Sequence, residues 1–410
     1  MAAEHVPLKY DLSVMTNTVR AVAVGNRFAA GAAVTEAGFV GELERIVGLA
    51  APHLIPDRPN LLVLGELVGL PAVLAGPRGS LARLAHSAST AMTLLALAYW
   101  PRVRYYRRRW PGTPLARALL LALADALYRP FAHTLARLAA ARGAHLVATT
   151  LVPHVRRSTH PPAITRFGRR GAREVYLPTG PEVYNAAFVF GPDGAQIGRV
   201  DKVFLTSSEK LILQLTPGRL ADVRVLATAA GRLGVATSLD AFTPAYLRHL
   251  CEQGAEIVLQ PDANDQLWTA ASHTHEWQPQ EWLNSVLGSV QPTYPGLRYN
   301  VCAMQTGQFF DRVFDGQSTI TAASNTSPEP MPNFVGNDGF YDSRTGERFL
   351  GKVLTMAPWV EDDPSTTDQS LSVAERRARL AAIGAQLLPG GTRAGQFRET
   401  VIWADLTLNR

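Results

Sequence analysis

Gly-Arg-Leu-Gly-Val-Ala-Thr-Ser-Leu-Asp, the stretch at residues 231–240, is the segment that decides the fold. It predicts a short apolar strand that ends in small polar residues. Thr243-Pro244 then begins a helix, since Thr caps a helix and Pro suits its first position. A further strand is expected at 255–260. Ser238 therefore lies at a turn from strand to helix, where a side chain projects into a pocket.

A carboxylate and an ammonium group follow two other predicted strands. The apolar run that starts at Asn60 ends in Leu-Gly-Glu at 64–66, which is the pattern of a buried strand with a functional residue at its end. Strands at 183–190 and 195–202 flank a Gly-Pro-Asp-Gly turn. The second of them runs into Asp-Lys-Val-Phe-Leu-Thr-Ser-Ser-Glu at 201–209.

Strands and helices alternate along the rest of the chain. The hydrophobic spacing predicts helices at 35–50, 131–142 and 373–387, and strands at 18–28, 143–152, 222–227, 299–305, 349–357 and 399–408. This interleaved order is typical of an α/β sandwich. We expect a single domain over 1–410, with a basic helical insertion at 76–130.

The three stretches above, together with Gln-Gly-Ala-Glu-Ile-Val-Leu-Gln-Pro-Asp-Ala-Asn at 253–264, resemble the nitrilase superfamily, the carbon-nitrogen hydrolases. The pattern of that superfamily is a Glu at a strand end, a Lys, a second Glu and a Cys. The resemblance covers roughly residues 18–75, 131–325 and 349–408. It implies a four-layer αββα sandwich and a homodimer.

The resemblance also implies roles for four residues, and the turn at Ser238 suggests a role for a fifth, Leu239. Glu66 would be the general base and acid, Lys202 the group that stabilises the developing oxyanion, and Glu209 the second carboxylate. Ser238 stands where the superfamily has its nucleophilic Cys. The amide of Leu239 would be a second oxyanion donor. The implied substrate is a small amide or nitrile, and no cofactor is expected.

The Glu-Lys-Glu arrangement is chemically reasonable without the family name. A carboxylate that faces an ammonium group keeps both ionised, and a second carboxylate nearby raises one acidic pKa toward the range useful for proton transfer. The Lys can place its charge on an oxygen that becomes negative only in the transition state.

Serine at position 238 is a departure with chemical consequences. A hydroxyl is a weak nucleophile that needs a proton acceptor, whereas a thiol ionises readily. The two cysteines are poor substitutes. Cys251 lies on a predicted helix about 20 Å along its axis from the turn, and Cys302 lies in an apolar strand typical of the core. With only two cysteines, a disulfide framework is not expected.

His273 and His275, with Glu276, are the candidate residues for a metal site, because alternate residues of a strand share a face. A solvated or substrate-lining loop is the favoured interpretation, so no metal is predicted. No dinucleotide or phosphate-binding glycine pattern occurs.

The positive charge of the chain belongs to the insertion. Gly76 to Arg142 holds eleven arginines and one acid, Asp125, while the whole chain has a net charge of +6. Residues 81–99 have helical spacing up to Pro101, which is expected to end the helix. A tip rich in Arg, Tyr and Trp follows, and Thr113-Pro114 begins another helix that Pro130 interrupts.

Three interpretations of this hairpin remain open. Apolar helices of this kind usually form a subunit interface or a lid. The aromatic residues and arginines at the tip also suit an anionic membrane surface, which residues 81–128 would bind. Nucleic acid is the least favoured partner. Neither helix has the roughly 20 apolar residues that span a bilayer. Since the first residues carry Glu4 and Asp11 and no signal-like apolar stretch, a cytoplasmic location is expected, peripheral to a membrane if the hairpin docks there.

Two functions follow from these residues. The first is a hydrolase that cleaves an amide or nitrile through Glu66, Lys202, Glu209 and Ser238. The alternative is an inactive protein of the same fold that binds a ligand, a partner or a membrane. We favour the enzyme, because a binding protein has no evident need for the Glu-Lys-Glu cluster.

Overall fold

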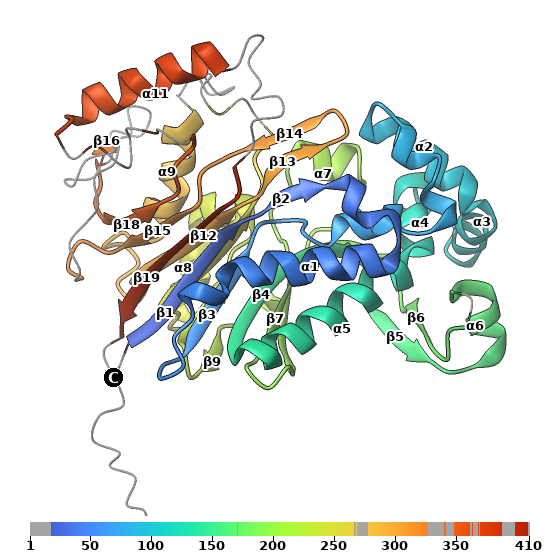
Figure 1. The fold of residues 1–410 in the computed structure, drawn as a ribbon. Helices are drawn as coiled ribbons and strands as arrows, with labels where there is room; N and C mark the ends of the chain where they lie inside the picture. The colour runs from blue at the N-terminus through green and yellow to red at the C-terminus, as the bar shows by residue number, and fades with distance from the viewer. Residues whose placement is uncertain are drawn as a thin grey trace, which may run out of the picture.

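Two facing β-sheets form the centre of the protein, and helices cover the outer face of each (Figure 1). The computed structural model describes residues 18–408 apart from residue 170 and the segments 266–267, 269–277, 327–339, 342–347, 361–362, 364–367, 369 and 388–397. Apolar side chains from both sheets fill the space between them, among them Val63, Val147, Val235 and Leu259. The expected four-layer αββα sandwich is therefore confirmed.

The first sheet has the strand order β19-β1-β3-β4-β7-β8. Its strands are β1 (Thr18–Gly25), β3 (Asn60–Leu64), β4 (Ala144–Val152), β7 (Tyr184–Phe190), β8 (Gln196–Asp201) and β19 (Thr400–Thr407). The central strands β1, β3 and β4 are parallel, and the outer pairings are antiparallel. All the residues of β3 and β4 are buried, as expected for strands covered on both faces.

The second sheet has the order β18-β15-β12-β11-β10-β9. Its strands are β9 (Leu226–Thr228), β10 (Gly231–Val235), β11 (Ile257–Asp262), β12 (Tyr299–Met304), β15 (Thr319–Ala322) and β18 (Lys352–Met356). Here β10, β11 and β12 are the parallel strands. Because parallel strands end at one edge of a sheet, the carboxyl ends of β10 and β11 lie side by side.

Amphipathic helices close the two outer layers. Helices α1 (Glu36–Ala50) and α5 (Ala124–Arg142) pack on the first sheet, for example through Phe39 and Phe131. Helix α8 (Pro244–Glu252) packs on the second sheet, and α9 (Gln278–Gly288) does so together with α11 (Val373–Leu387). Smaller elements are β2 (Arg27–Ala29), β5 (Val155–Ser158), β6 (Val175–Pro178), β13 (Thr306–Phe309), β14 (Arg312–Asp315), β16 (Phe340–Tyr341), β17 (Arg348–Phe349), α6 (Pro161–Phe167) and the short 3-10 helices η2 (Ala30–Val34), η3 (Ala51–His53), η4 (Leu70–Leu74) and η5 (Pro77–Gly79).

Three sequence predictions in the sandwich need correction. The strand expected at 18–28 is divided at the buried Asn26 into β1 and β2. Only the end of the strand expected at 222–227 is a strand, the short β9, because Asp222 ends the 3-10 helix η7 (Leu220–Asp222) and residues 223–225 have no regular structure. Pro130 does not interrupt its helix but lies inside α5. A proline costs a helix interior about 3 kcal/mol, and the buried residues on both sides of Pro130 offset that cost.

The insertion is mostly helical, in more pieces than its sequence suggests. After η6 (Ala82–Leu84) come α2 (Ala88–Ala98), α3 (Trp100–Arg109) and α4 (Leu115–Ala122). Pro101, expected to end a helix, instead lies in the first turn of α3, where its missing amide hydrogen costs no helical bond. The arginine-rich stretch is therefore a helix and not an irregular tip.

The aromatic residues of that stretch face the protein. Tyr106 is only 3% exposed and stacks on Trp110, and Tyr105 meets Phe167 of α6 edge to face. Among the described residues, no helix is long and apolar enough to cross a membrane.

Candidate functional site

The residues singled out in the sequence meet where strands of both sheets end. Glu66 follows β3, and Lys202 follows β8. Glu209 lies in α7 (Ser207–Leu211), and Ser238 begins the 3-10 helix η8 (Ser238–Phe242). The amide of Glu66 donates to the carbonyl of Asp262 across 3.1 Å, which joins the end of β3 to the end of β11 in the other sheet.

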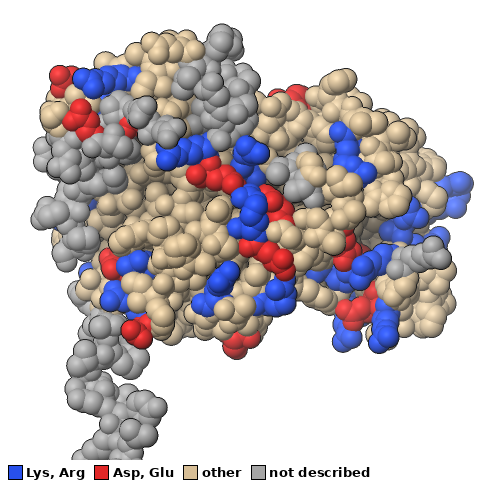
Figure 2. Space-filling model, in the orientation of Figure 1, with Lys and Arg blue, Asp and Glu red and all other residues tan. Residues whose placement is uncertain are grey.

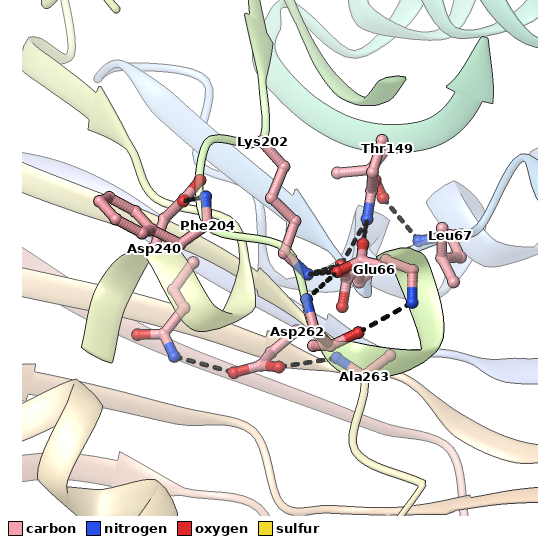
Figure 3. Close-up of polar contacts among 12 residues, drawn as sticks. Glu66, Leu67, Thr149, Lys202, Phe204, Asp240, Asp262 and Ala263 are labelled. Carbon is pink, nitrogen blue, oxygen red and sulfur yellow. Dashed lines mark hydrogen bonds and ion pairs between the residues drawn. The ribbon is translucent and has the colours of Figure 1, made fainter. Parts of the chain in front are cut away.

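Lys202 contacts both glutamates, and Figure 3 shows its side chain reaching Glu66. Its Nζ is 2.9 Å from Glu66 Oε1 and 3.0 Å from Glu209 Oε2, and its side chain is 1% exposed. Asn185 on β7 links the same pair, because its Nδ2 donates to Glu66 Oε1 at 2.6 Å and to Glu209 Oε1 at 2.8 Å. The predicted Glu-Lys-Glu cluster is thus present as a buried network with one additional member.

Local sequence explains how Glu209 is positioned. Thr206 caps α7 by accepting from the amide of Glu209, and Glu209 Oε2 accepts from the amide of Thr206 at 2.8 Å, which is a complete capping box. Glu209 is therefore a helix-start acid and a partner of Lys202 at once.

Two non-glycine residues at the site have left-handed backbone conformations. The φ angle is 64° at Leu67, directly after Glu66, and 49° at Ser238. Such conformations cost about 1–3 kcal/mol and cluster at functional sites. The amide of Leu67 donates to Thr149 Oγ1 at 2.5 Å, which helps to hold the first of these turns.

The electrostatics of the cluster separate its two glutamates. Burial raises the pKa of Glu66 to about 8, and the neighbouring charges of Glu209 and Asp262 add to this rise against the effect of Lys202. Burial would also raise the pKa of Glu209, but Lys202 and Asn185 hold it below its usual range. Glu66 and Glu209 keep the pKa of Lys202 above its ordinary value despite its burial. At neutral pH the charged Lys202 therefore forms an ion pair with an ionised Glu209, and Glu66 carries a proton.

The raised pKa of Glu66 leads to a prediction about stability. Between its ordinary value of 4.5 and about 8, the folded protein holds a proton that the unfolded chain releases. This contribution to stability is full below about pH 4.5 and is lost as the pH rises through about 8. As the pH rises from about 5 to 8, the free energy of unfolding measured in urea should therefore fall less for Glu66→Gln than for the native protein. The infrared band of protonated carboxyl groups at pH 7 should also be weaker in Glu66→Gln than in the native protein. Identical pH slopes and bands would mean that Glu66 is ionised.

Three further site residues were not singled out in the sequence. Asp240 is fully buried, and its carboxylate accepts from the amides of Val203 and Phe204, directly after Lys202; burial raises its pKa to about 7. Asp262 ends β11, and Asn185 is the second residue of β7. Asp262 ends an apolar strand much as Glu66 follows one, so the same pattern in the sequence could have identified it.

The remaining sequence candidates are placed as follows. Leu239 is the second residue of η8, in the turn whose amides have no partner inside a helix. Cys251 lies on α8, and Cys302 is fully buried on β12, where burial raises the pKa of its thiol well above the usual range. His273, His275 and Glu276 lie outside the described residues. Elsewhere in the described chain, no group of three metal-ligating side chains comes together.

The two facing sheets, with a charged cluster at their strand ends, define an αββα sandwich protein with a buried Glu-Lys-Glu site. The sequence profile described as carbon-nitrogen hydrolase matches residues 110–324, just over half of the chain. The chain belongs to this family, within the nitrilase superfamily. Lys202, Glu209, Ser238 and Asp262 lie in the matched range, and Glu66 precedes it.

Solved structures with a related fold are distant in sequence. A carbon-nitrogen hydrolase from Helicobacter pylori G27 is 16% identical, with a TM-score of 0.47 over 75% of this chain and 82% of that one. The Nit3 protein of Saccharomyces cerevisiae is 16% identical, with a TM-score of 0.43 over 74% and 82%. An amidase from Nesterenkonia sp. is 16% identical, with a TM-score of 0.40 over 75% and 83%. A search of curated protein sequences returns no match.

Proposed function

We propose that the protein hydrolyses a small amide or nitrile through an acyl-enzyme formed on Ser238. The observation that carries the proposal is the buried contact of Lys202 with both Glu66 and Glu209 in a member of the carbon-nitrogen hydrolase family. Lys202 would stabilise the oxyanion, together with the amide of Leu239. Glu66 would exchange protons with the reacting groups, and Glu209 would keep Lys202 charged.

The left-handed turn at Ser238 supports its role as nucleophile. By its sequence pattern Ser238 would take the place at which the superfamily has its Cys. Its φ of 49° at the start of η8 supports this role, because strained turns of this kind present nucleophiles. The test is ammonia release from a panel of short amides and nitriles. Release from none of them, together with saturable binding of one, would favour the alternative, a protein of this fold that binds a ligand without turning it over.

The outer face of α2 and α3 supports a second proposal, docking on an anionic membrane surface. Leu97 and Trp100 are 65% and 44% exposed, and Arg104 and Arg108 continue the same helical face. Figure 2 shows Lys and Arg side chains toward the end of the molecule that carries α3. Each arginine near an anionic surface contributes about 1 kcal/mol, and Trp favours the headgroup level.

Sedimentation with vesicles tests this second proposal. We expect the native protein to bind vesicles that contain phosphatidylglycerol and to leave vesicles of phosphatidylcholine alone. The double variant Leu97→Ser/Trp100→Ser should bind at least about tenfold more weakly, while Ile197→Ser, which changes an exposed residue of β8, should not. The native protein could instead form a concentration-dependent dimer that the double variant alone fails to form. That result would show that a second copy of the chain, and not a membrane, binds this face.

A further inference from the structure

We propose that Asp262, and not Glu66, is the carboxylate that accepts the proton of the Ser238 hydroxyl. This inference rests on the proposed function, because it assigns a partner to the same nucleophile. Asp262 is 4% exposed and lies at the last position of β11.

The register of the second sheet brings the two residues together. Strands β10 and β11 are parallel neighbours, and Val235 pairs with Leu259. The amide of Ala236 continues the ladder by donating to the carbonyl of Leu259 at 2.9 Å. Ser238 and Asp262 each lie three residues beyond the paired positions, at the same edge of the sheet. Burial raises the pKa of the Asp262 carboxyl, and hydrogen bonds from Gln260 and the Ser238 hydroxyl, with the nearby charge of Lys202, counter that rise by favouring the ionised form.

The carboxylate of Asp262 is held in one orientation. Its Oδ2 accepts from Gln260 Nε2 at 2.9 Å, and its Oδ1 accepts from the amide of Ala263 at 2.8 Å (Figure 3). Gln260 is fixed in turn, because its Nε2 also donates to Ser285 Oγ and its Oε1 accepts from Asn300 Nδ2, both at 2.9 Å. Gln260, Ser285 and Asn300 are fully buried. A base oriented by a third group is the arrangement that activates a hydroxyl nucleophile.

Glu66 is less suited to this step. Among the described residues, Lys202 and Asn185 both donate to its Oε1, and the raised pKa keeps a proton on this carboxyl at neutral pH. A protonated carboxyl cannot accept a proton but can donate one to a leaving amine. The two carboxylates would then divide the acid and base roles.

In the acylation of an amide by these groups, every bond and every proton is accounted for. Ser238 Oγ forms a bond to the carbonyl carbon, and its proton moves to Asp262. The carbonyl oxygen becomes the oxyanion beside Lys202. When it collapses, the C–N bond breaks, and the amine leaves with the proton of Glu66. Water then attacks the ester, returns one proton each to Ser238 and Glu66, and releases the acid, while Asp262 loses its proton to the product carboxylate or solvent.

A double-mutant cycle tests the assignment. The probe is p-nitrophenyl acetate, and the rate measured is acetylation of residue 238, followed by nitrophenol release and by intact mass. Asp262→Asn should slow acetylation of the native serine by about 100-fold to 10,000-fold, the range of general-base catalysis. In the Ser238→Cys background the same change should cost at least about tenfold less, because a thiol ionises with less help.

Each outcome has a separate meaning. Equal losses in the Ser and Cys backgrounds would show that Asp262 is only structural and would overturn the inference. If Asp262→Asn leaves the rate of Ser238 acetylation unchanged, the inference about Asp262 is also overturned, but the proposed function stands. No acetylation of native Ser238 would instead contradict the proposed function. If Asp262→Asn does not fold by circular dichroism, Asp262→Ser replaces it in the cycle, since its hydroxyl can still accept from Gln260.

Discussion

Ser238→Ala is expected to abolish acyl-adduct formation and to reduce turnover by at least about a thousandfold, because loss of the nucleophile removes the covalent route. Intact-protein mass spectrometry after incubation with amides, nitriles and activated esters provides the measurement. The native protein should show an acyl adduct that the Ala variant lacks. Since alanine differs from serine by one atom at a position that is only 8% exposed, the fold should persist.

The Ser238→Cys variant is the matched control for this experiment. It should keep the adduct and form it faster, because a thiolate is the better nucleophile and Lys202 lies in the same cluster. Adduct and turnover that appear only in the Cys variant would mean that the pocket is intact and that the native chain has given up covalent chemistry. An adduct in the Ala variant would place the nucleophile elsewhere.

Lys202→Met is expected to lower the free energy of unfolding by about 3–5 kcal/mol at neutral pH, in addition to abolishing turnover. The reason is that Glu66 and Glu209 would lose the cation they share and remain buried, 3% and 7% exposed. Urea denaturation followed by circular dichroism measures the loss. It should shrink as the pH falls, because protonation of Glu209 removes the buried charge that lost its partner, whereas Glu66 is already protonated at neutral pH.

Two comparisons make this prediction specific. Lys210→Met changes an exposed lysine of α7, close to Lys202 in the chain, and should alter stability by less than about 1 kcal/mol. Adding Glu66→Gln and Glu209→Gln to Lys202→Met should recover part of the loss, since no buried charge then lacks a partner. A Lys202→Met protein as stable as the Lys210→Met protein would show that the cluster does not depend on Lys202.

The sequence predicted the sandwich because its signals are local. An apolar run that ends in Glu66, a Gly-rich turn before Lys202 and a Thr-Pro helix start after Ser238 each depend on neighbours in the chain. The joint order of these signals then allowed the site residues to be named before any contact between them was known. The observed contacts of Lys202 with Glu66 and Glu209 are what that order implied.

What the sequence could not supply is the outcome of long-range packing. A proline such as Pro130 is expected to break a helix, yet α5 continues through it because its face is buried on both sides of Pro130. In the sequence, Tyr105 and Tyr106 resemble aromatic residues that lie at a membrane surface. In the structure, Phe167 of α6, some sixty residues later in the chain, packs against both of them. Asn185 has no local signal at all, since only the fold places it between the glutamates of two distant segments.

The hydrogen bond from the amide of Glu66 to the carbonyl of Asp262 joins the two sheets at the residues that would do the chemistry. The amide of Gln305 donates to the same carbonyl at 2.8 Å, so this one oxygen serves three chain segments. The site cannot come apart by fraying of a single strand, because its parts separate only when the sheets do. Exchange of the Glu66 amide hydrogen with solvent therefore reports opening of the whole sandwich, and cooperativity of the fold protects the site from local unfolding.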